Sequence, residues 1–170
     1  MILTGSAIQT AVRKGLITLE PFLATNINPN SYNYHLSDTL LVHTPDGRRW
    51  RKKSIPETGL VLNPGQVYLA STLEEIGSSR YVMLLLGRSS IGRLGIFLNI
   101  TADLGHVGSC SHWTLELTVI QPVRIYPRMC IGQVSFWHVA SSRTIAYDGR
   151  YSNDVGAVAN RDARLRTFKS

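Results

Sequence analysis

Residues 87–95 read Gly87-Arg88-Ser89-Ser90-Ile91-Gly92-Arg93-Leu94-Gly95. This stretch joins two apolar runs, residues 82–86 (VMLLL) and residues 96–100 (IFLNI), and runs of this length are typical of buried strands. The stretch itself is polar and contains glycine, serine and arginine. We therefore expect a short connection between two strands of a sheet.

The serines and arginines of this connection suggest two interpretations. Ser89 is a candidate N-cap for a short helical turn, and the spacing of Ile91 and Leu94 would turn both side chains inward. Backbone N–H groups at such a turn, with Arg88 and Arg93 beside them, would suit an anion such as phosphate. A polar loop with solvated arginines fits the same residues. This stretch alone favours the anion-binding turn only slightly over the polar loop.

In the rest of the chain, the alternation of apolar and polar residues and the spacing of turn residues predict many short strands. Residues 112–121 alternate apolar and polar side chains, which is the period of a half-buried strand. Further strands are expected near residues 16–19, 32–36, 40–43, 66–72, 123–126 and 131–139, with residues 48–53 as an edge strand or a loop. Residues 4–14 have the spacing of a short amphipathic helix, and residues 73–76 that of a helical turn. The fold class is thus mainly β, a sandwich or jelly-roll-like barrel with one or two short helices.

Composition and charge place the chain in a broad class. Its 170 residues fit one domain over residues 1–170, of which residues 141–170 form a polar, glycine-containing lid and tail. The net charge of +7 favours an anionic partner. Nucleic acid is not expected, because no stacking aromatic residues interleave with the basic clusters. No membrane segment is expected, and the two distant cysteines, Cys110 and Cys130, favour a reducing cytoplasm.

Glu116 is the carboxylate that stands out, because its strand is otherwise composed of Trp, Leu, Thr and Val. Such a carboxylate is a candidate general base, although the alternation of the strand equally allows Glu116 to face solvent. The five histidines show no metal-binding spacing and no H-x-E…P-C-x-x-C signature occurs, so no zinc is expected. Ser89 has no nucleophile-elbow context, which favours a role in holding water or ligand.

These segments resemble the dCTP deaminase branch of the dCTP deaminase/dUTPase superfamily. The resemblance covers nearly the whole chain and is carried by the motif of residues 87–95, by Thr101-Ala102, by Leu115-Glu116 and by residues 8–22, 30–36, 62–72, 131–136 and 147–158. It implies a distorted β-barrel of the dUTPase-like β-clip type and a homotrimer with active sites between subunits. It also implies zinc-independent hydrolytic deamination of a deoxycytidine nucleotide, most simply dCTP to dUTP and ammonia.

The resemblance also implies a role for each matching residue. Glu116 is the general base, and Ser89, Arg93 and the carbonyl of Ala102 hold the attacking water. Mg²⁺ arrives bound through the nucleotide phosphates, and dTTP is an implied feedback inhibitor. The implied substrate-binding residues are Arg88, Ser89, Ser90, Thr101, His106, Tyr147, Arg150, Tyr151 and Asp154.

Three positions depart from the family pattern. Leu104 stands where an arginine is usual, His106 where an aspartate holds the sugar hydroxyl, and Asp154 where a glutamine approaches the phosphates. A histidine can still hydrogen-bond a hydroxyl, whereas a carboxylate repels phosphate. The number of phosphates and the base therefore stay open. A dUTPase-like or bifunctional diphosphatase and a catalytically silent nucleotide binder remain as alternatives.

Overall fold

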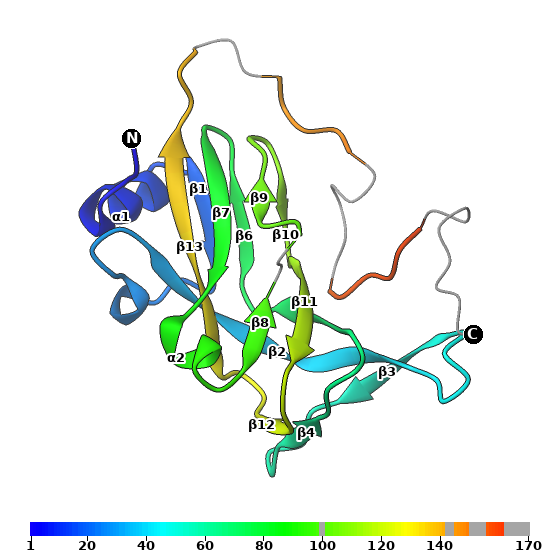
Figure 1. Ribbon diagram of the computed structural model, residues 1–170. Helices are drawn as coiled ribbons and strands as arrows, with labels where there is room; N and C mark the ends of the chain where they lie inside the picture. The colour runs from blue at the N-terminus through cyan, green and yellow to red at the C-terminus, as the bar shows by residue number, and fades with distance from the viewer. Residues whose placement is uncertain (99–100, 142–144, 150–155, 162–170) are drawn as a thin grey trace.

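The protein is a curled antiparallel β structure with two short α-helices on its periphery (Figure 1). The computed structural model describes residues 1–98, 101–141, 145–149 and 156–161. The principal sheet has eight strands in the order β8-β11-β5-β2-β13-β7-β9, with β3 paired to β2. Its strands are β2 (Tyr32–His43), β3 (Trp50–Ser54), β5 (Tyr68–Thr72), β7 (Tyr81–Gly87), β8 (Ile96–Leu98), β9 (Leu104–Gly105), β11 (Thr114–Val119) and β13 (Cys130–His138).

Two smaller sheets and the helices close the rest of the structure. The three-stranded sheet contains β1 (Ile17–Glu20), β6 (Glu75–Ser78) and β10 (Cys110–Ser111), and a two-stranded sheet pairs β4 (Leu60–Leu62) with β12 (Val123–Ile125). The helices are α1 (Gly5–Arg13), α2 (Ser89–Gly92) and the 3-10 turn η1 (Ala24–Asn26). The mainly β fold class predicted from the sequence is confirmed. Neither α-helix in the described ranges has the length and apolarity of a membrane span.

Helix α1 forms where its sequence signals predict it. The Thr4 side chain accepts a hydrogen bond from the Ala7 amide at 3.4 Å, which satisfies one free N–H group of the first turn. Ile8 and Ala11, one turn apart, are buried against the barrel. Gly15 follows with φ +68, a conformation that ends the helix without steric strain.

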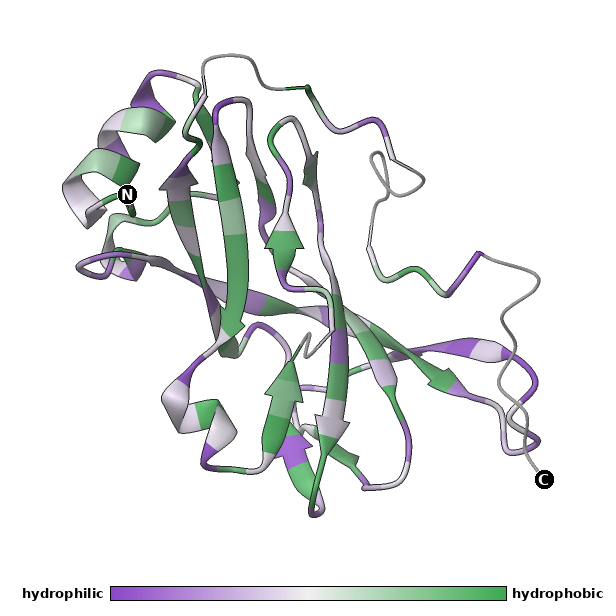
Figure 2. Ribbon diagram, turned by 45° about the horizontal axis from the view of Figure 1, so that its top comes forward, coloured by the Kyte–Doolittle hydropathy of each residue, from purple (hydrophilic) through white to green (hydrophobic). Residues whose placement is uncertain are grey.

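The core lies inside the curled sheet, where alternate residues of each strand meet. Figure 2 shows apolar residues alternating with polar ones along the strands. Buried side chains come from β2, β7, β11 and β13, among them Tyr32, Tyr34, Met83, Leu115 and Phe136, each 0% exposed. At about 25 cal/mol per Å² of buried apolar surface, this cluster is the main source of folding free energy.

Two local predictions are wrong. Residues 73–76 form no helical turn, because Glu75 and Ile76 belong to strand β6, which pairs with β1 at Glu20 and Leu19. The apolar spacing of Leu73 and Ile76 resembled a helix only because the window is too short to show the strand period. Strand β2 is also continuous from Tyr32 to His43, with an irregular register between Leu36 and Leu40 in place of a break.

Gly132 of β13 offers a direct test of core packing. A Cβ atom at this position would overlap the ring of buried Tyr34, whose hydroxyl donates to the Leu86 carbonyl at 3.2 Å. We expect Gly132→Ala to lower the free energy of unfolding by about 1–3 kcal/mol through overpacking, measured by urea denaturation. The control is Gly92→Ala, whose Cβ would meet nothing within 4 Å. Equal stability of the two variants would contradict this account of the contact.

Candidate active site

The connection between β7 and β8 forms a single helical turn, α2. Its backbone is held by hydrogen bonds from the Gly92 amide to the Arg88 carbonyl at 3.0 Å and from the Arg93 amide to the Ser89 carbonyl at 3.1 Å. Ile91 is 5% exposed and anchors the turn to the core. Gly95 leaves the turn with φ +79, a conformation that favours glycine. The predicted helical turn is therefore present.

Two details of this turn differ from the sequence prediction. Ser89 is the first helical residue, and the N-cap position is occupied by Arg88, which makes no side-chain capping hydrogen bond. Leu94 does not face inward with Ile91, since it is 47% exposed. The chain leaves the helix before a second turn could bring Leu94 onto the buried face. Ser89, Ser90 and Arg93 are exposed.

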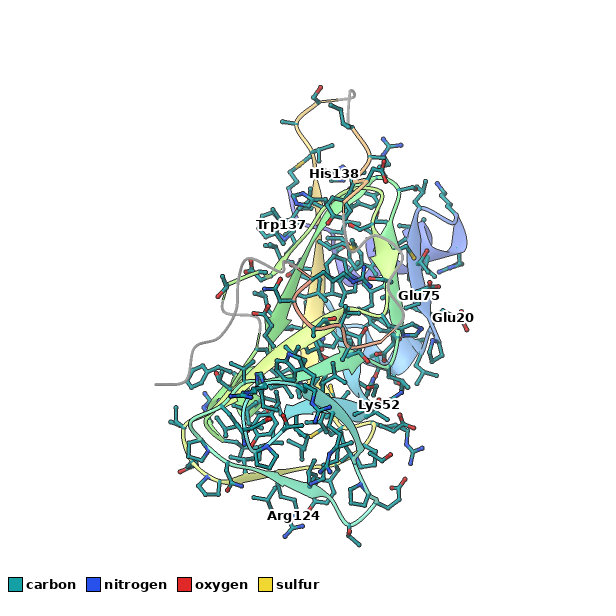
Figure 3. The ribbon with its side chains drawn as sticks, turned by 90° about the vertical axis from the view of Figure 1, so that its right-hand side faces the viewer. Glu20, Lys52, Glu75, Arg124, Trp137 and His138 are labelled. Carbon is teal, nitrogen blue, oxygen red and sulfur yellow. The ribbon has the colours of Figure 1, made fainter. Side chains whose placement is uncertain are left out.

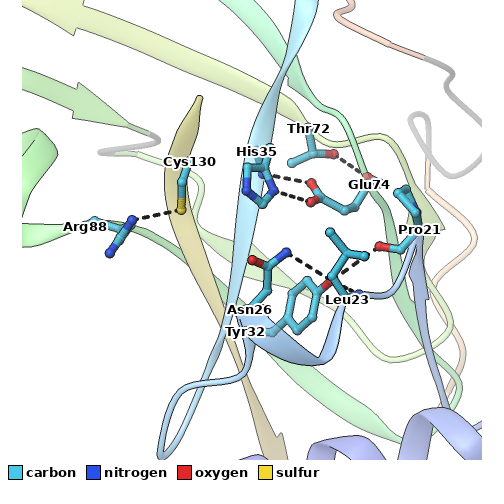
Figure 4. A network of polar contacts seen from close by, with 9 residues as sticks. All are labelled: Pro21, Leu23, Asn26, Tyr32, His35, Thr72, Glu74, Arg88 and Cys130. Atoms are coloured by element: carbon cyan, nitrogen blue, oxygen red, sulfur yellow. Dashed lines mark hydrogen bonds and ion pairs between the residues drawn. The ribbon is translucent and has the colours of Figure 1, made fainter. Parts of the chain in front are cut away.

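Arg88 is half-buried and oriented by a cysteine. Its Nη1 atom donates a hydrogen bond to the Sγ atom of Cys130 on β13 at 2.9 Å (Figure 4). Burial raises the pKa of the Cys130 thiol, and the nearby Arg88 charge and hydrogen bond partly offset that rise. The predicted phosphate-binding guanidinium is thus held to the sheet at one of its nitrogens.

The Arg88–Cys130 contact predicts a pH profile. In a Cys110→Ser background, the rate of Cys130 alkylation should rise with pH around a midpoint above that of an ordinary thiol, because the thiolate is the reactive form. Arg88→Gln should shift that midpoint further upward, since the positive charge that stabilises the thiolate is lost. The measured quantity is the pH midpoint of alkylation. The maximal rate is not used, because loss of the Arg88 side chain also makes Cys130 more accessible to the reagent, and this changes only the rate. A lower midpoint in Arg88→Gln would contradict the contact.

Glu116 lies on the outer face of β11. Leu115 and Leu117 on either side of it are fully buried in the core, whereas Glu116 itself is half-buried on the opposite face. In the antiparallel ladder it stands opposite Leu69 of β5. The predicted alternation is confirmed, and the carboxylate occupies a surface that is neither core nor fully open.

A C-terminal segment contacts this same outer face. The Val158 amide donates to the Thr114 hydroxyl at 3.1 Å, and Thr114 lies two residues before Glu116 on the same side of β11. Residues 156–159 are half-buried as a result. This contact brings the polar C-terminal part of the chain to the strand that carries the candidate base.

The loop after β9 contains the third group of predicted residues. Thr101 and Ala102 are exposed ahead of β9, and β9 pairs with β7 through Leu104 opposite Leu84. His106 stacks on the ring of Tyr147, with centroids 5.3 Å apart and planes at 20°. These two predicted substrate-binding residues, 41 positions apart in the sequence, are therefore brought together.

The start of the C-terminal segment is also fixed to this loop by its backbone. The Tyr147 amide donates to the Val107 carbonyl at 2.9 Å. A Cβ atom on Gly108 would lie 2.9 Å from the Cβ of Ala146, so the loop and the segment are in close contact. Of the other residues predicted in the C-terminal lid, Arg150, Tyr151 and Asp154 lie outside the described residues.

The predicted site residues lie in separate parts of the chain. Figure 1 shows α2 on one side of β8 and β11 on the other, with β9 farther up the sheet. Ser89 and Arg93, predicted to hold the water, lie in α2 and at its C-cap, and Glu116, the predicted base, lies on β11. His106 lies in the loop after β9 and stacks on Tyr147 of the C-terminal segment. The roles assigned to these side chains stay predictions.

A buried pair that the sequence did not indicate lies near Arg88. Glu74 is 1% exposed, and its carboxylate accepts hydrogen bonds from the His35 amide at 2.8 Å and from His35 Nδ1 at 2.6 Å (Figure 4). His35 stands opposite Cys130 in the β2–β13 ladder. Burial, with the Cys130 and Glu74 charges, raises the pKa of the adjacent Tyr34 hydroxyl. Only the pairing of β2 with β13 and β5 reveals this polar cluster.

The positions of the His, Cys, Asp and Glu side chains show where a metal ion could be held by the protein. No three His, Cys, Asp or Glu side chains within the described ranges gather as they would around a metal ion. A magnesium ion held by nucleotide phosphates needs few protein ligands, because it usually keeps several waters. The residues described are compatible with magnesium that enters with a nucleotide.

Comparisons with known proteins agree on one family. Residues 2–139 match the family described as dCTP deaminase-like. The chain is 42% identical over 163 residues to a dCTP deaminase of Rhodopirellula baltica, covering 91% of this chain and 82% of that protein. It is 40% identical over 162 residues to a dUMP-forming dCTP deaminase of Hathewaya histolytica, covering 92% and 94%.

A solved structure supports the fold. The crystal structure of the 2′-deoxycytidine 5′-triphosphate deaminase from Agrobacterium tumefaciens superimposes with a TM-score of 0.62 at 22% identity, covering 79% of this chain. This chain spans 47% of the length of that protein. Together with the family match over most of the β structure, the sequence resemblance is confirmed: the chain belongs to the dCTP deaminase-like family.

Proposed function

We propose that the protein deaminates dCTP by hydrolysis. The observation that carries this proposal is the half-buried carboxylate of Glu116 on the outer face of β11, in a chain of the dCTP deaminase-like family. Relatives at 40–42% identity are named dCTP deaminases. A carboxylate flanked by buried leucines has a fixed position, which general base catalysis requires.

The proposed reaction uses the described residues as follows. Glu116 takes a proton from a water molecule, whose oxygen attacks C4 of the cytosine. Ser89, Arg93 and the Ala102 carbonyl hold that water. The proton then reaches the leaving amino group, the C4–N bond breaks, and uracil nucleotide and ammonia are released. The water is activated by a carboxylate, without zinc.

Phosphate and sugar would bind to the remaining elements. Arg88, Ser89 and Ser90 lie at the start of α2, where positive charge and hydroxyl groups suit a phosphate chain carrying Mg²⁺. The stacked His106 and Tyr147 would contact the deoxyribose, and Thr101 is a further proposed binding residue. We extend the site to Arg150, Tyr151 and Asp154 on the strength of the family resemblance alone.

A homotrimer would complete the site. The resemblance to the dCTP deaminase branch supports this assembly, because it implies active sites between subunits. Light scattering after size-exclusion chromatography should give three times the 18.9 kDa mass of one chain. The free thiols of Cys110 and Cys130 suit a reducing compartment, and we propose the cytoplasm.

A second activity is favoured by the names of several relatives. Proteins at 40–41% identity are named dUMP-forming dCTP deaminases. Such an enzyme would also hydrolyse the nucleotide between its α- and β-phosphates, releasing dUMP and pyrophosphate. In the superfamily, hydrolysis of the phosphate chain depends on an aspartate at the position of His106. The histidine found here argues against this second step.

One assay separates these functions. The protein is incubated with dCTP, dCMP and dUTP and Mg²⁺, and ammonia, pyrophosphate and nucleotides are quantified. Deamination alone gives ammonia and dUTP from dCTP, whereas the bifunctional enzyme gives ammonia, pyrophosphate and dUMP. A dUTPase gives pyrophosphate from dUTP without ammonia. If no product forms while nucleotides raise the melting temperature, the chain is a silent binder and the proposal is wrong. Added dTTP should inhibit as a feedback ligand.

A further inference from the structure

The hairpin of β2 and β3 projects from the barrel as a two-stranded arm. Register pairs run from Thr39 opposite Ser54 to His43 opposite Trp50, whereas the pairing of β2 with β5 ends at Leu41. The outer edge of β3 is free of further strands in the part of the chain that the structure describes. Figures 1 and 2 show this polar hairpin extending beyond the sheet. We call residues 42–54 the basic arm.

The arm concentrates positive charge. It contains five of the 18 basic residues of the chain, all of them exposed: Arg48, Arg49, Arg51, Lys52 and Lys53. Neither of the two ion pairs found among described residues involves them, since these join His35 to Glu74 and Arg128 to Glu57. Figure 3 shows Lys52 on the arm, away from His138 at the end of β13.

Hydrogen bonds define the turn at the tip of the arm. The Thr44 amide donates to the Arg49 carbonyl at 2.8 Å, and the Gly47 amide donates to the Thr44 carbonyl at 2.7 Å. The Asp46 carboxylate, the only acidic group of the arm, accepts from the Thr44 hydroxyl and from the Arg48 amide. A partner would therefore meet a preformed surface, which lowers the entropic cost of binding.

Two aromatic rings pack against each other where the strands of the arm meet the turn. The rings of His43 and Trp50 pack against each other across the two strands, with centroids 3.8 Å apart and planes tilted by 35°. From the sequence, no stacking aromatic residue is expected among the basic clusters. Trp50 lies between Arg49 and Arg51, and its ring packs on His43. The His43 Nδ1 atom is buried there and lacks a hydrogen-bond partner among the described residues.

The geometry points to a nucleic acid partner: we propose that the basic arm binds the phosphodiester backbone of nucleic acid without sequence specificity. A two-stranded ribbon fits the major groove of duplex DNA. Successive side chains of β3 point to opposite faces, so Arg51 and Lys53 would reach the phosphates on one side of the groove and Lys52 those on the other. Cation–phosphate contacts of this kind supply most of the non-specific affinity of nucleic-acid-binding proteins.

Other polyanions fit the arm less well. A membrane-binding arm would present apolar side chains at its tip, but the tip is Pro45-Asp46-Gly47. A second copy of this chain would need a matching acidic surface, whereas the chain has 11 acidic residues against 18 basic ones. The proposal is independent of the deaminase activity, because no predicted site residue lies on the arm.

The test is fluorescence anisotropy with labelled duplex DNA, single-stranded DNA and RNA of about 20 residues, in about 50–200 mM salt. The wild-type protein should bind at least one of them, the duplex most tightly, with an affinity that falls steeply with salt. The triple variant Arg51→Gln, Lys52→Gln, Lys53→Gln should bind at least about ten-fold more weakly at 50 mM salt. Its salt slope should fall by about 0.9 for each lost contact with duplex phosphates.

The matched control removes the same charge elsewhere. Arg13, Lys14 and Arg80 are exposed and lie outside the arm, and their triple Gln variant should change the affinity less than two-fold. The melting temperature of each variant monitors folding, and Arg48→Gln with Arg49→Gln, which alters only turn side chains, serves if the first triple variant does not fold. Absence of wild-type binding at 50 mM salt, or equal losses in arm and control variants, would overturn the proposal. So would binding to phosphatidylserine vesicles without binding to any oligonucleotide.

Discussion

Replacing Glu116 by glutamine should reduce ammonia release from dCTP by about 10²–10⁴-fold, because the amide cannot accept the proton of the attacking water. The side chain keeps its size, so the half-buried position on β11 should stay filled and the fold intact. Steady-state ammonia release with saturating dCTP measures the effect on kcat. An unchanged melting temperature shows that the loss is chemical.

The control for this variant is Glu75→Gln. Glu75 is also a half-buried strand carboxylate, but it lies on β6 beside Glu20 of β1 (Figure 3). It should leave ammonia release within about two-fold of wild type, since a surface substitution outside the site changes little. If Glu116→Gln retains full activity, Glu116 is not the base and the proposed mechanism fails.

Replacing Glu74 by alanine should destabilise the protein by about 3–5 kcal/mol, as removal of one partner from a buried polar pair does. The His35 amide and ring nitrogen both donate to the Glu74 carboxylate, at 2.8 and 2.6 Å, and would lose that acceptor inside the structure. The cavity left by the carboxylate adds to this loss. Urea denaturation with a common m-value measures the difference in free energy of unfolding.

Glu57→Ala is the matched control. Glu57 pairs with Arg128, but both side chains are well exposed, at 78% and 60%. Solvent screens such a pair, so its loss should change stability by about 0–1 kcal/mol. If Glu74→Ala were as mild as Glu57→Ala, the His35–Glu74 pair would contribute no more than a surface contact.

Much of the fold was predictable because its signals are local. The cap, spacing and terminating glycine of α1 lie within a dozen residues, and the period of two in β11 is visible from Leu115 to Val119. The prediction for residues 73–76 was wrong because strand β6 is defined by its pairing with β1, not by its own four residues. The predicted N-cap, Ser89, is instead the first residue of α2, and Arg88 is the N-cap. The end of strand β7 determines where the helix begins, and the local sequence does not show this.

The candidate site was only partly predictable. The exposed polar residues of α2 and the outward side of Glu116 follow from local patterns. The stack of His106 on Tyr147 and the Arg88–Cys130 hydrogen bond join segments about 40 residues apart, and no periodicity encodes such contacts. The catalytic roles of Glu116, Ser89 and Arg93 remain predictions that the assays above test.

The linear chain is sufficient to infer the family, the mainly β class and the connection of residues 87–95 between two strands. These depend on residue types and short-range spacing, which are properties of the linear chain. The tertiary structure alone decided that Glu74 is buried under His35, that Cys130 orients Arg88 and that the five cations of residues 48–53 project on a free arm. Side chains become buried, and charged groups come close to one another, only when strands distant in the sequence pair. These features therefore cannot be inferred from the linear chain.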